Sequence, residues 1–222
     1  MGQSVSGVGV LDKSMAVLAA VGEAEGACSL ADLVAATGIS RATAHRLAVA
    51  LEVHGLLRRD GEGRFALGFR LVGLGHTAAA GWPLAEAARP ALLALRDETG
   101  ESAQLYVRDG DHRVCVVSLE SPHELRTIVA EGARLPLAVG SAGRILSGTA
   151  PADGWTASVG ERAPGVASVS AGVVVGGAVV AAVGISGPEE RLGADPGRRF
   201  GAAVAAAAAL IGDAARPEPR RG

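Results

Sequence analysis

Four hydrogen-bond donors stand close together in a segment whose residue spacing predicts a helix. They are Arg41, Thr43, His45 and Arg46. Apolar residues of the same segment recur three and four positions apart and would bury the opposite face. These are Ala44, Leu47, Ala48 and Leu51. Guanidinium, imidazole and hydroxyl groups on the exposed face of a helix can donate to phosphates and to base edges in the major groove of DNA.

A shorter helix is expected just before this one, over residues 30–37. Ser29 and Asp32 have the spacing of a capping box, in which each side chain accepts a backbone N–H of the other residue. Gly38 can adopt the left-handed conformation that ends a helix. Ser40 is expected to cap the helix that follows and is also predicted to contact DNA. Two capped helices around a tight turn predict a helix-turn-helix. An earlier helix would close its core with the inward stripe Leu11, Met15 and Leu18.

A basic hairpin is expected directly after these helices, with short strands at 56–59 and 64–67 around a Gly-rich turn. Its arginines Arg58, Arg59 and Arg64 would face a phosphate backbone. Between residues 39 and 70, six arginines stand against three acidic residues, whereas the whole chain has a formal net charge of −2. We therefore predict a winged helix-turn-helix over residues 1–68 that binds double-stranded operator DNA. The alternative is a purely structural helical module with solvated arginines.

The second half of the chain has a different pattern, that of an antiparallel sheet with helices at its ends. A linker helix is expected over 69–82, and helical pieces begin at Pro83 and at Pro90. The predicted strands are 104–107 and 113–117, a further strand over 126–130, and two valine-rich strands around Gly176-Gly177. Ser141 is expected to cap a short helix, and residues 199–211 a closing helix. The fold class is α+β, with a small-molecule domain over 83–216.

Composition excludes several classes of protein. The two cysteines, Cys28 and Cys115, are too few for a disulfide framework and indicate a reducing, cytoplasmic compartment. His112 and Cys115 have a ligand-like spacing, but nothing nearby completes a site, so we expect neither a metal nor a cofactor. Residues 163–188 carry no charge, yet their paired glycines and valine runs favour two buried strands over a membrane span. We also expect no signal peptide.

An enzyme is not expected. The sequence holds no nucleophile elbow, because the stretch around Ser141 lacks the glycine two residues before the serine. No phosphate-binding glycine motif is present either. Two other classes stay open: a metabolite-binding sensor module without operator-specific DNA binding, and a scaffold that acts through the alanine-rich terminal helix.

Seven blocks of the chain resemble the IclR family of bacterial transcription regulators, and within it the actinobacterial NdgR-like group that controls amino-acid metabolism, including leucine biosynthesis. The blocks are GVGVLDK (7–13), LVAATG (33–38), TAHRLAVALEVH (43–54), GRFALG (63–68), LRDETGESAQLY (95–106), PGVASVSA (164–171) and ISGPEERL (185–192). The resemblance implies a GAF-like effector domain and a homodimer or dimer of dimers on a palindromic operator. The implied effector, an amino acid or a small carboxylate, would be bound by Ser141, Ala142, Ser158, Ser168, Gly184 and Ser186.

Two departures from the family pattern bear on that effector. Carboxylate-sensing relatives place an aspartate, a cysteine and a serine where this chain has Ser158, Ser168 and Gly184. The connection from Gly148 to Gly154 is short where the family carries a longer helical segment beside the pocket. We expect the shortened wall and the purely neutral serine donors to make effector binding weak, at millimolar affinity or below detection.

Overall fold

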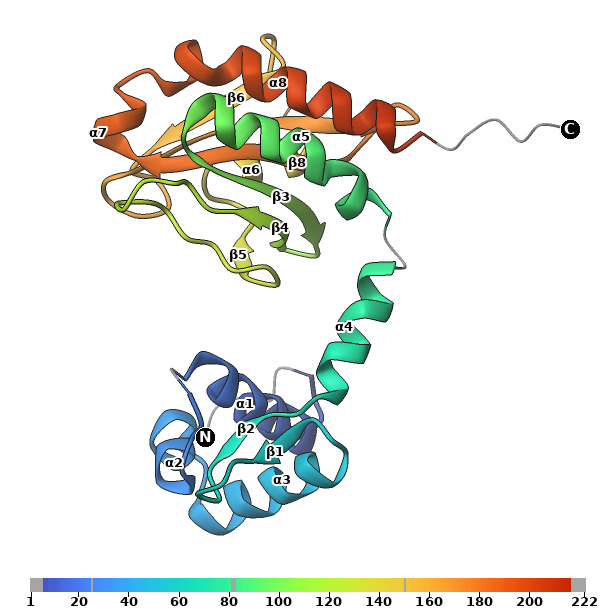
Figure 1. The fold of residues 1–222 in the computed structure, drawn as a ribbon, viewed down its shortest axis with the longest axis vertical. Coiled ribbons are helices and arrows are strands. Elements are labelled where there is room, and N and C mark those ends of the chain that lie inside the picture. The colour runs from blue at the N-terminus through green and yellow to red at the C-terminus, as the bar shows by residue number, and fades with distance from the viewer. Residues whose placement is uncertain (1–5, 25, 81–82, 150, 217–222) are drawn as a thin grey trace, which may run out of the picture. The chain divides into compact units, whose positions relative to one another are not determined.

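The computed structural model describes residues 6–24, 26–80, 83–149 and 151–216. The chain divides into two compact units, Met1–Gly81 and Trp82–Gly222, which are described separately (Figure 1). Within the described residues, none of the helices combines the length and the apolar composition that crossing a bilayer requires.

The N-terminal unit consists of three helices, a two-stranded hairpin and a further helix. The elements are α1 (Gly9–Glu23), α2 (Leu30–Thr37), α3 (Arg41–Val53), β1 (Leu57–Arg59), β2 (Phe65–Leu67) and α4 (Arg70–Ala80). β1 and β2 are antiparallel, with Arg58 opposite Ala66. The predicted helix-turn-helix and hairpin are thus present at the expected positions.

The core of this unit joins all three helices to the hairpin. Its most buried side chains include Val17, Leu33, Ala48, Leu57 and Phe65. Cys28 closes it by pairing its backbone with Phe65 in both directions, each N–O distance being 2.7 Å.

The predicted inward stripe of α1 was wrong at two of its three residues. Leu11 and Met15 are more than half exposed, Leu18 is partly buried, and the buried face of α1 is carried by Val17 and Val21. Leu11, Met15 and Leu18 are four and three positions apart, and Val17 and Val21 are four apart, so periodicity alone could not choose between the two faces.

The predicted cap of α2 is confirmed, whereas the predicted side-chain cap of α3 was wrong. The capping box is present: Asp32 N donates to Ser29 Oγ at 3.2 Å, and Ser29 N donates to Asp32 Oδ2 at 2.9 Å. The hydrogen bonds from Ser29 lower the pKa of the Asp32 carboxyl. Gly38 ends α2 at φ 66°. Ser40 is the N-cap residue of α3, but its hydroxyl donates to Thr43 Oγ1 at 3.0 Å and caps no backbone N–H.

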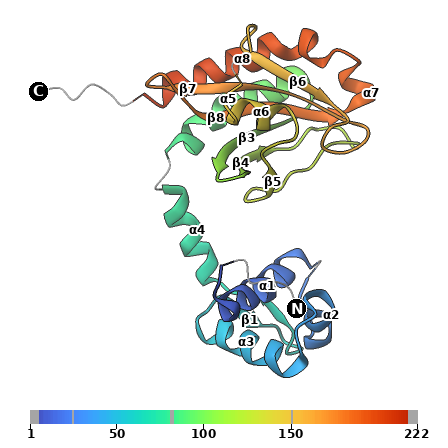
Figure 2. The ribbon, with the colours of Figure 1, turned by 180° about the vertical axis from the view of Figure 1, so that it is seen from behind.

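The C-terminal unit is a six-stranded antiparallel sheet with helices on both faces. Its elements are α5 (Leu84–Thr99), β3 (Ser102–Asp109), β4 (His112–Leu119), β5 (Arg134–Pro136), α6 (Ser141–Leu146), β6 (Trp155–Val159), β7 (Val166–Val175), β8 (Ala178–Pro188), α7 (Glu189–Leu192) and α8 (Pro196–Ala214). The strand order is β5-β4-β3-β8-β7-β6. α5 and α8 pack on one face, and α6 packs on the other, as the two opposite views show (Figures 1 and 2).

Two expectations for this unit were wrong. Residues 126–130 form no strand, and the edge strand β5 lies further along the chain. The segment is held by side chains instead: Ser102 Oγ donates to Thr127 O at 2.7 Å, and Arg126 Nε pairs with Glu120 at 2.6 Å. Pro90 starts no new helix. It lies inside α5, which runs without interruption from the N-cap Pro83.

Trp155, at the start of β6, fixes the edge of the sheet to α8. A Cβ at Gly197 or at Gly201 would lie 2.0 or 2.3 Å from atoms of the Trp155 ring. The two glycines, one helical turn apart, therefore leave a flat surface on α8 against which the indole ring packs. Only glycine leaves room for this ring.

The outer edge of β6 is covered by a side chain of α6. Arg144 donates through Nη2 to the carbonyl oxygen of Ala157. Its Nη1 pairs with Glu161 Oε1 at 2.5 Å, which holds the guanidinium over the strand. An edge carbonyl that no neighbouring strand reaches is thus satisfied from within the chain.

Candidate nucleic-acid interface and small-molecule pocket

The exposed face of α3 carries the four predicted donors, which we call the recognition face (Arg41, Thr43, His45 and Arg46). Arg41, His45 and Arg46 are exposed, and Thr43 is half-buried. Ala44, Ala48 and Leu51 are buried on the opposite side of the helix. Among the described residues, no acidic side chain forms an ion pair with Arg41 or Arg46, so both guanidinium groups keep their donors available for a ligand.

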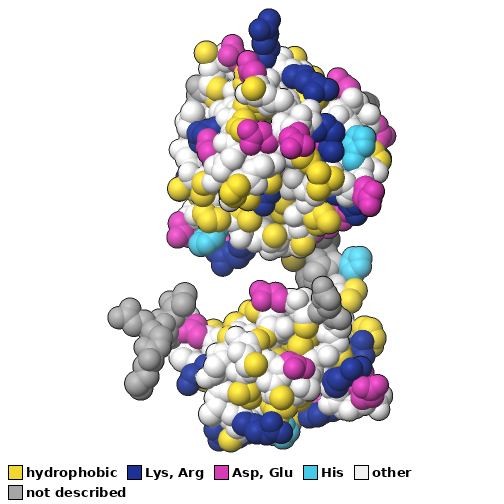
Figure 3. Space-filling view, turned by 90° about the vertical axis from the view of Figure 1, so that its left-hand side faces the viewer, with side chains coloured by type: hydrophobic (Ala, Val, Ile, Leu, Met, Phe, Trp, Pro, Cys, Tyr) yellow, Lys and Arg dark blue, Asp and Glu magenta, His cyan; other side chains and the backbone are white. Residues whose placement is uncertain are grey.

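Contact between Ser40 and Thr43 orders the start of the recognition face. Because Ser40 donates to Thr43 Oγ1, the Thr43 hydroxyl hydrogen stays available to an acceptor. Basic side chains gather along the lower rim of the N-terminal unit in the space-filling view (Figure 3).

The three arginines of the wing hairpin differ in how they are held. Arg59 is tied to α3, because its Nε pairs with Glu52 at 3.1 Å and its guanidinium lies 4.3 Å from the centre of the Phe65 ring. Arg58 lies 5.2 Å from the Phe69 ring centre and, among the described residues, pairs with no carboxylate. Arg58 is therefore the wing arginine best placed to meet a phosphate.

Arg64 is held by the acidic turn of the wing. Its Nε lies 2.8 Å from Asp60 Oδ2, and its Nη1 lies 3.3 Å from Glu62 Oε2. Asp60 Oδ1 also accepts the backbone N–H groups of Glu62 and Arg64, each at 2.9 Å. Hydrogen bonding to the backbone of Arg64 is the main cause that lowers the pKa of the Asp60 carboxyl. The acidic turn partly neutralises Arg64.

In the C-terminal unit, strand register brings the predicted effector residues together. Ser158 stands opposite Ser168, and Ser168 stands opposite Ser186 on the next strand. Gly184 stands opposite Ser170 on one side and opposite Gln104 on the other. All six predicted residues line one cavity. Its lining consists of Gln104, Tyr106, Arg113, Gly140, Ser141, Ala142, Ser158, Arg162, Val166, Ser168, Ser170, Gly184, Ile185 and Ser186.

A chain of hydroxyl groups fills most of this cavity; we call Ser158, Ser168, Ser141 and Ser170 the serine chain. Neighbouring oxygens in it lie 3.0, 2.8 and 2.8 Å apart. Ser141 therefore does not cap α6, whose N-cap residue is Gly140. Gly184 makes room for this chain, since a Cβ there would lie 2.4 Å from Ser170 Oγ.

The cavity holds little free space, and no described residue of the 148–154 connection is part of its lining. Its free volume is about 20 Å³, which is room for about one water molecule. Ser141 and Gln104 are each 1% exposed. The side chains of the lining therefore leave little free space in the cavity.

Sequence reasoning missed the charged and amide groups of the cavity. Arg113 is buried, lies 5.5 Å from the ring centre of Tyr106, and donates through Nη1 to Pro136 O and, at 2.6 Å, to Val139 O. Burial lowers its pKa and raises that of the Tyr106 phenol. Arg162 is the second cation of the lining. The expectation of purely neutral donors was therefore wrong, because two guanidinium groups also line the cavity.

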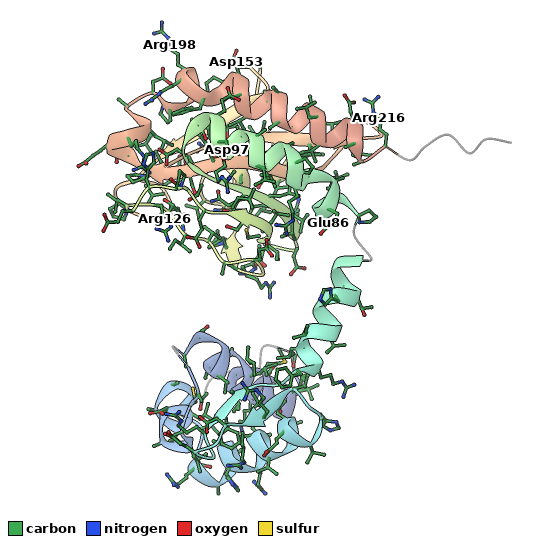
Figure 4. All side chains as sticks on the ribbon, viewed as in Figure 1. Glu86, Asp97, Arg126, Asp153, Arg198 and Arg216 are labelled. Carbon is green, nitrogen blue, oxygen red and sulfur yellow. The ribbon has the colours of Figure 1, made fainter. Side chains whose placement is uncertain are left out.

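Charged side chains on the outer surface of this unit do not reach the cavity. Six of them are labelled in Figure 4, and all are exposed: Glu86, Asp97, Arg126, Asp153, Arg198 and Arg216. None of these lines the cavity.

The cysteines and histidines form no reactive or metal-binding cluster in the part of the chain that the structure describes. Burial is the main cause that raises the pKa of the Cys115 thiol to about 12 and also raises that of Cys28. Both thiols therefore stay protonated at neutral pH and are poor nucleophiles.

Two family profiles match the chain. The IclR helix-turn-helix domain matches residues 10–61, and the C-terminal domain of the bacterial transcriptional regulator IclR matches residues 76–153. Among curated proteins, the HTH-type transcriptional regulator KipR of Bacillus subtilis is 33% identical over 116 residues, which cover 52% of this chain and 46% of KipR. The chain spans about half the length of KipR and of the transcriptional repressor IclR of Escherichia coli in these matches.

Solved structures share the fold over nearly the whole chain. A putative transcriptional regulator from Rhodococcus sp. RHA1 superposes with a TM-score of 0.74 at 24% identity, covering 93% of this chain and 98% of that one. An IclR homolog from Microbacterium hydrocarbonoxydans, complexed with 4-hydroxybenzoate, gives 0.77 at 19% identity and covers 92% and 98%. At these identities the likeness establishes the fold alone.

Proposed function

The chain belongs to the IclR family of bacterial transcriptional regulators, and from this premise we propose that it is a sequence-specific DNA-binding regulator whose affinity for its operator responds to a small-molecule effector. The observation that carries the proposal is the recognition face, with Arg41 and Arg46 exposed and, within the described residues, free of acidic partners. Such donors can read base edges once α3 lies in a major groove.

The wing supplies the second part of the DNA interface in this proposal. Arg58 meets phosphates directly, whereas Arg59 positions the wing against α3 through Glu52. Arg64 contributes only part of its charge, because the acidic turn holds it. Phosphate contacts of this kind set affinity and register without reading sequence.

We also propose a homodimer, or a dimer of dimers, on a palindromic operator. One winged module contacts too few base pairs to select a site in a genome, so a second copy is needed. Exposed apolar side chains on α1, on α4 and at the residue just before α4 support this assembly. They are Leu11, Met15, Phe69, Val72 and Leu74. Covering them with a second copy would bury apolar surface that is otherwise in water.

The division of labour along the chain follows from these assignments. Residues 1–68 bind DNA, 69–82 link and pair two copies, and 83–216 carry the effector domain. We place the protein in the cytoplasm, where operators lie. The family neighbour from Microbacterium was solved with 4-hydroxybenzoate, which supports a small-molecule ligand for this cavity as well.

For the regulated pathway we propose amino-acid metabolism, including leucine biosynthesis. Its support is the resemblance of blocks such as 43–54 and 95–106 to the NdgR-like group. The proposal names the pathway only; the chemistry of the effector is a separate question.

Genome-wide DNA capture with the full chain tests the proposal. The wild type should enrich a two-fold symmetric motif upstream of amino-acid genes. An Arg41→Ala, Arg46→Ala double variant should lose the motif while its circular-dichroism spectrum stays unchanged. Capture of no common motif by the wild type would favour a sensor module without operator-specific DNA binding. Enrichment of other promoters would refute only the pathway.

A further inference from the structure

Within the described part of the N-terminal unit, helix α4 is held to the other elements through its first turn. Leu71 is half-buried, whereas every residue from Val72 to Ala78 is exposed. In both opposite views α4 runs away from the three-helix core of its unit (Figures 1 and 2). The contacts of residues 68–71 therefore decide the direction in which α4 leaves that core.

The backbone just before this turn lies directly against the end of the recognition helix α3. α3 ends at Gly55, which has φ 71° and whose N–H donates to Glu52 O at 2.9 Å. Gly68 N donates to Leu56 O at 2.8 Å. A Cβ at Gly68 would overlap the backbone of Gly55 and Leu56. Two backbone segments are thus in contact here, with no side chain between them.

Arg70 adds a side-chain contact across the same junction. Its Nη1 donates at 3.0 Å to the carbonyl oxygen of His54, which is the C-cap residue of α3. The last carbonyls of a helix have no partner within the helix, so a cation there makes a hydrogen bond and also interacts favourably with the helix dipole. The stem of Arg70 passes over Gly55, where a Cβ would lie 3.4 Å from Arg70 Cβ. Arg70 therefore locks the first turn of α4 to the end of α3.

We propose that Arg70 is a positioning residue that sets the spacing between the two half-sites of the operator. The inference rests on the proposed dimer, in which exposed apolar residues of α4 face a second copy. Because the first turn of α4 is locked to α3, pairing through α4 holds the two recognition helices at a fixed separation and angle. One extra base pair between the half-sites moves one of them by about 3.4 Å and turns it by about 35°. A locked junction resists that change, whereas a junction without the Arg70 contact can follow it.

Operators whose half-sites are separated by spacers of stepwise increasing length test this role. Fluorescence anisotropy with the full chain should show that the wild type prefers one spacer over its neighbours by about tenfold. Arg70→Met keeps the stem over Gly55 and removes the guanidinium. Its preference should fall to about threefold or less, because the charged hydrogen bond to His54 O is lost, while the preferred half-site sequence stays the same. Arg70→Lys can still donate to His54 O and should restore part of the preference.

Loss of a positive charge has its own effect on DNA affinity, and Arg64→Met is the matched control for it. The ion pairs of Arg64 are with Asp60 and Glu62 of the wing. Arg64→Met should weaken binding to every spacer alike. If Arg70→Met does the same, with a smaller salt slope, then Arg70 contacts a phosphate and the positioning role is wrong.

A distance measured without DNA examines the junction by itself. Val53 on α3 is 79% exposed, and His76 on α4 is exposed, so spin labels on Val53→Cys and His76→Cys report the angle between the two helices. Both native cysteines are buried. With labelled chains diluted by unlabelled ones, pulsed electron paramagnetic resonance should give one narrow distance distribution. Adding Arg70→Met to the labelled chain should broaden it.

Two results would overturn the proposal: an unchanged spacer preference, or an unchanged distance distribution, in a folded Arg70→Met chain. A wild type that binds every spacer and single half-sites alike refutes the symmetric operator of the proposed function, and the spacing role with it. A distance distribution that broadens in Arg70→Met would still show, in that case, that Arg70 locks the junction. Melting curves identify a variant that fails to fold, and Arg70→Lys then carries the comparison with the wild type.

Discussion

Glu101 and Arg191, 90 positions apart, form a two-point ion pair: Nε lies 2.5 Å from Oε1 and Nη2 lies 2.8 Å from Oε2. The Glu101 side chain is 2% exposed and the Arg191 side chain 29% exposed. Arg191 also donates to Leu125 O at 3.0 Å. One side chain thereby joins the start of β3, α7 and the loop before residue 126.

Replacing Arg191 should destabilise the C-terminal unit strongly. Arg191→Ala leaves a buried carboxylate without its cation, and breaking such a pair costs about 3–5 kcal/mol when both groups are buried. Partial exposure of Arg191 reduces our expectation to about 2–4 kcal/mol. Urea unfolding measures the loss. Exposed Arg198→Ala serves as the control, and equal midpoints for the two variants would contradict the assignment.

Because Trp155 packs directly on Gly201, mutations of these two residues should have non-additive effects on the free energy of unfolding. Gly201→Ala should destabilise the protein by about 1–3 kcal/mol, because the new methyl group would overlap the indole. In a Trp155→Ala background the same change should be neutral or stabilising, since alanine favours the helix. A double-mutant cycle from thermal melts tests this. Additive effects would show that the ring and the glycine do not compete for space.

The recognition face should carry sequence discrimination. Arg46→Ala and Thr43→Ala are each expected to reduce the preference for operator over scrambled DNA, by about 1–3 kcal/mol where a base edge is contacted. Fluorescence anisotropy with both DNAs at several salt concentrations measures the difference. If Arg46→Ala weakens both DNAs equally, its contact is with phosphate rather than with a base.

The wing should carry affinity without discrimination. Arg58→Ala should weaken all DNA alike and lower the salt slope by roughly one counterion. Arg64→Ala should do the same to a smaller extent, because Asp60 already holds that guanidinium. Asp60→Asn should release Arg64 and raise affinity for every sequence. The Asp60 variant is therefore expected to raise DNA affinity and the Arg58 variant to lower it.

Low pH should destabilise the wing by protonating the Asp60 carboxylate. The folded-state pKa of Asp60 lies below its ordinary value, so its contribution to wing stability is present at neutral pH. It is lost as the pH falls through that lowered pKa. Asp60→Asn should remove this acid dependence of wing stability, as followed by melting curves at several pH values, whereas a wing that keeps the dependence in the variant would point to another group.

Assembly should depend on the exposed apolar residues of α1 and α4. The wild type is expected to scatter light as a particle of at least twice the 22.1 kDa chain mass at micromolar concentration. Met15→Glu combined with Val72→Glu should shift it toward the monomer and abolish operator binding. Leu210→Glu, exposed on α8, is the control. A monomeric wild type would contradict the proposed dimer.

Local chemistry explains what could be predicted from the sequence. Ser29 and Asp32 satisfy each other within one helical turn, so their spacing alone reveals the cap. The same is true of the turn at Gly176-Gly177 between β7 and β8. The side chains of α3 could be assigned to two faces because Ala44, Ala48 and Leu51 leave only one buried side.

Features that depend on contacts between distant parts of the chain could not be predicted from the sequence. Gln104 reads as one polar residue in an apolar run, and only the pairing with Gly184 places it on the cavity. Arg113 looks like a solvated strand residue until the carbonyls of Pro136, at the end of β5, and of Val139, in the loop that follows, enclose it. Residues 126–130 have the composition of a strand, yet the segment lies outside the sheet. Ser102 bonds to Thr127 within it, and Arg191 bonds to Leu125 just before it.

The guanidinium that covers the edge of β6 has a consequence for the protein in a crowded cell. A sheet edge with free carbonyls is a template on which neighbouring molecules can add strands and grow into aggregates. Arg144 occupies the Ala157 carbonyl, and Glu161 holds it there by charge. Replacing Arg144 would expose that carbonyl and should make strand addition at this edge easier.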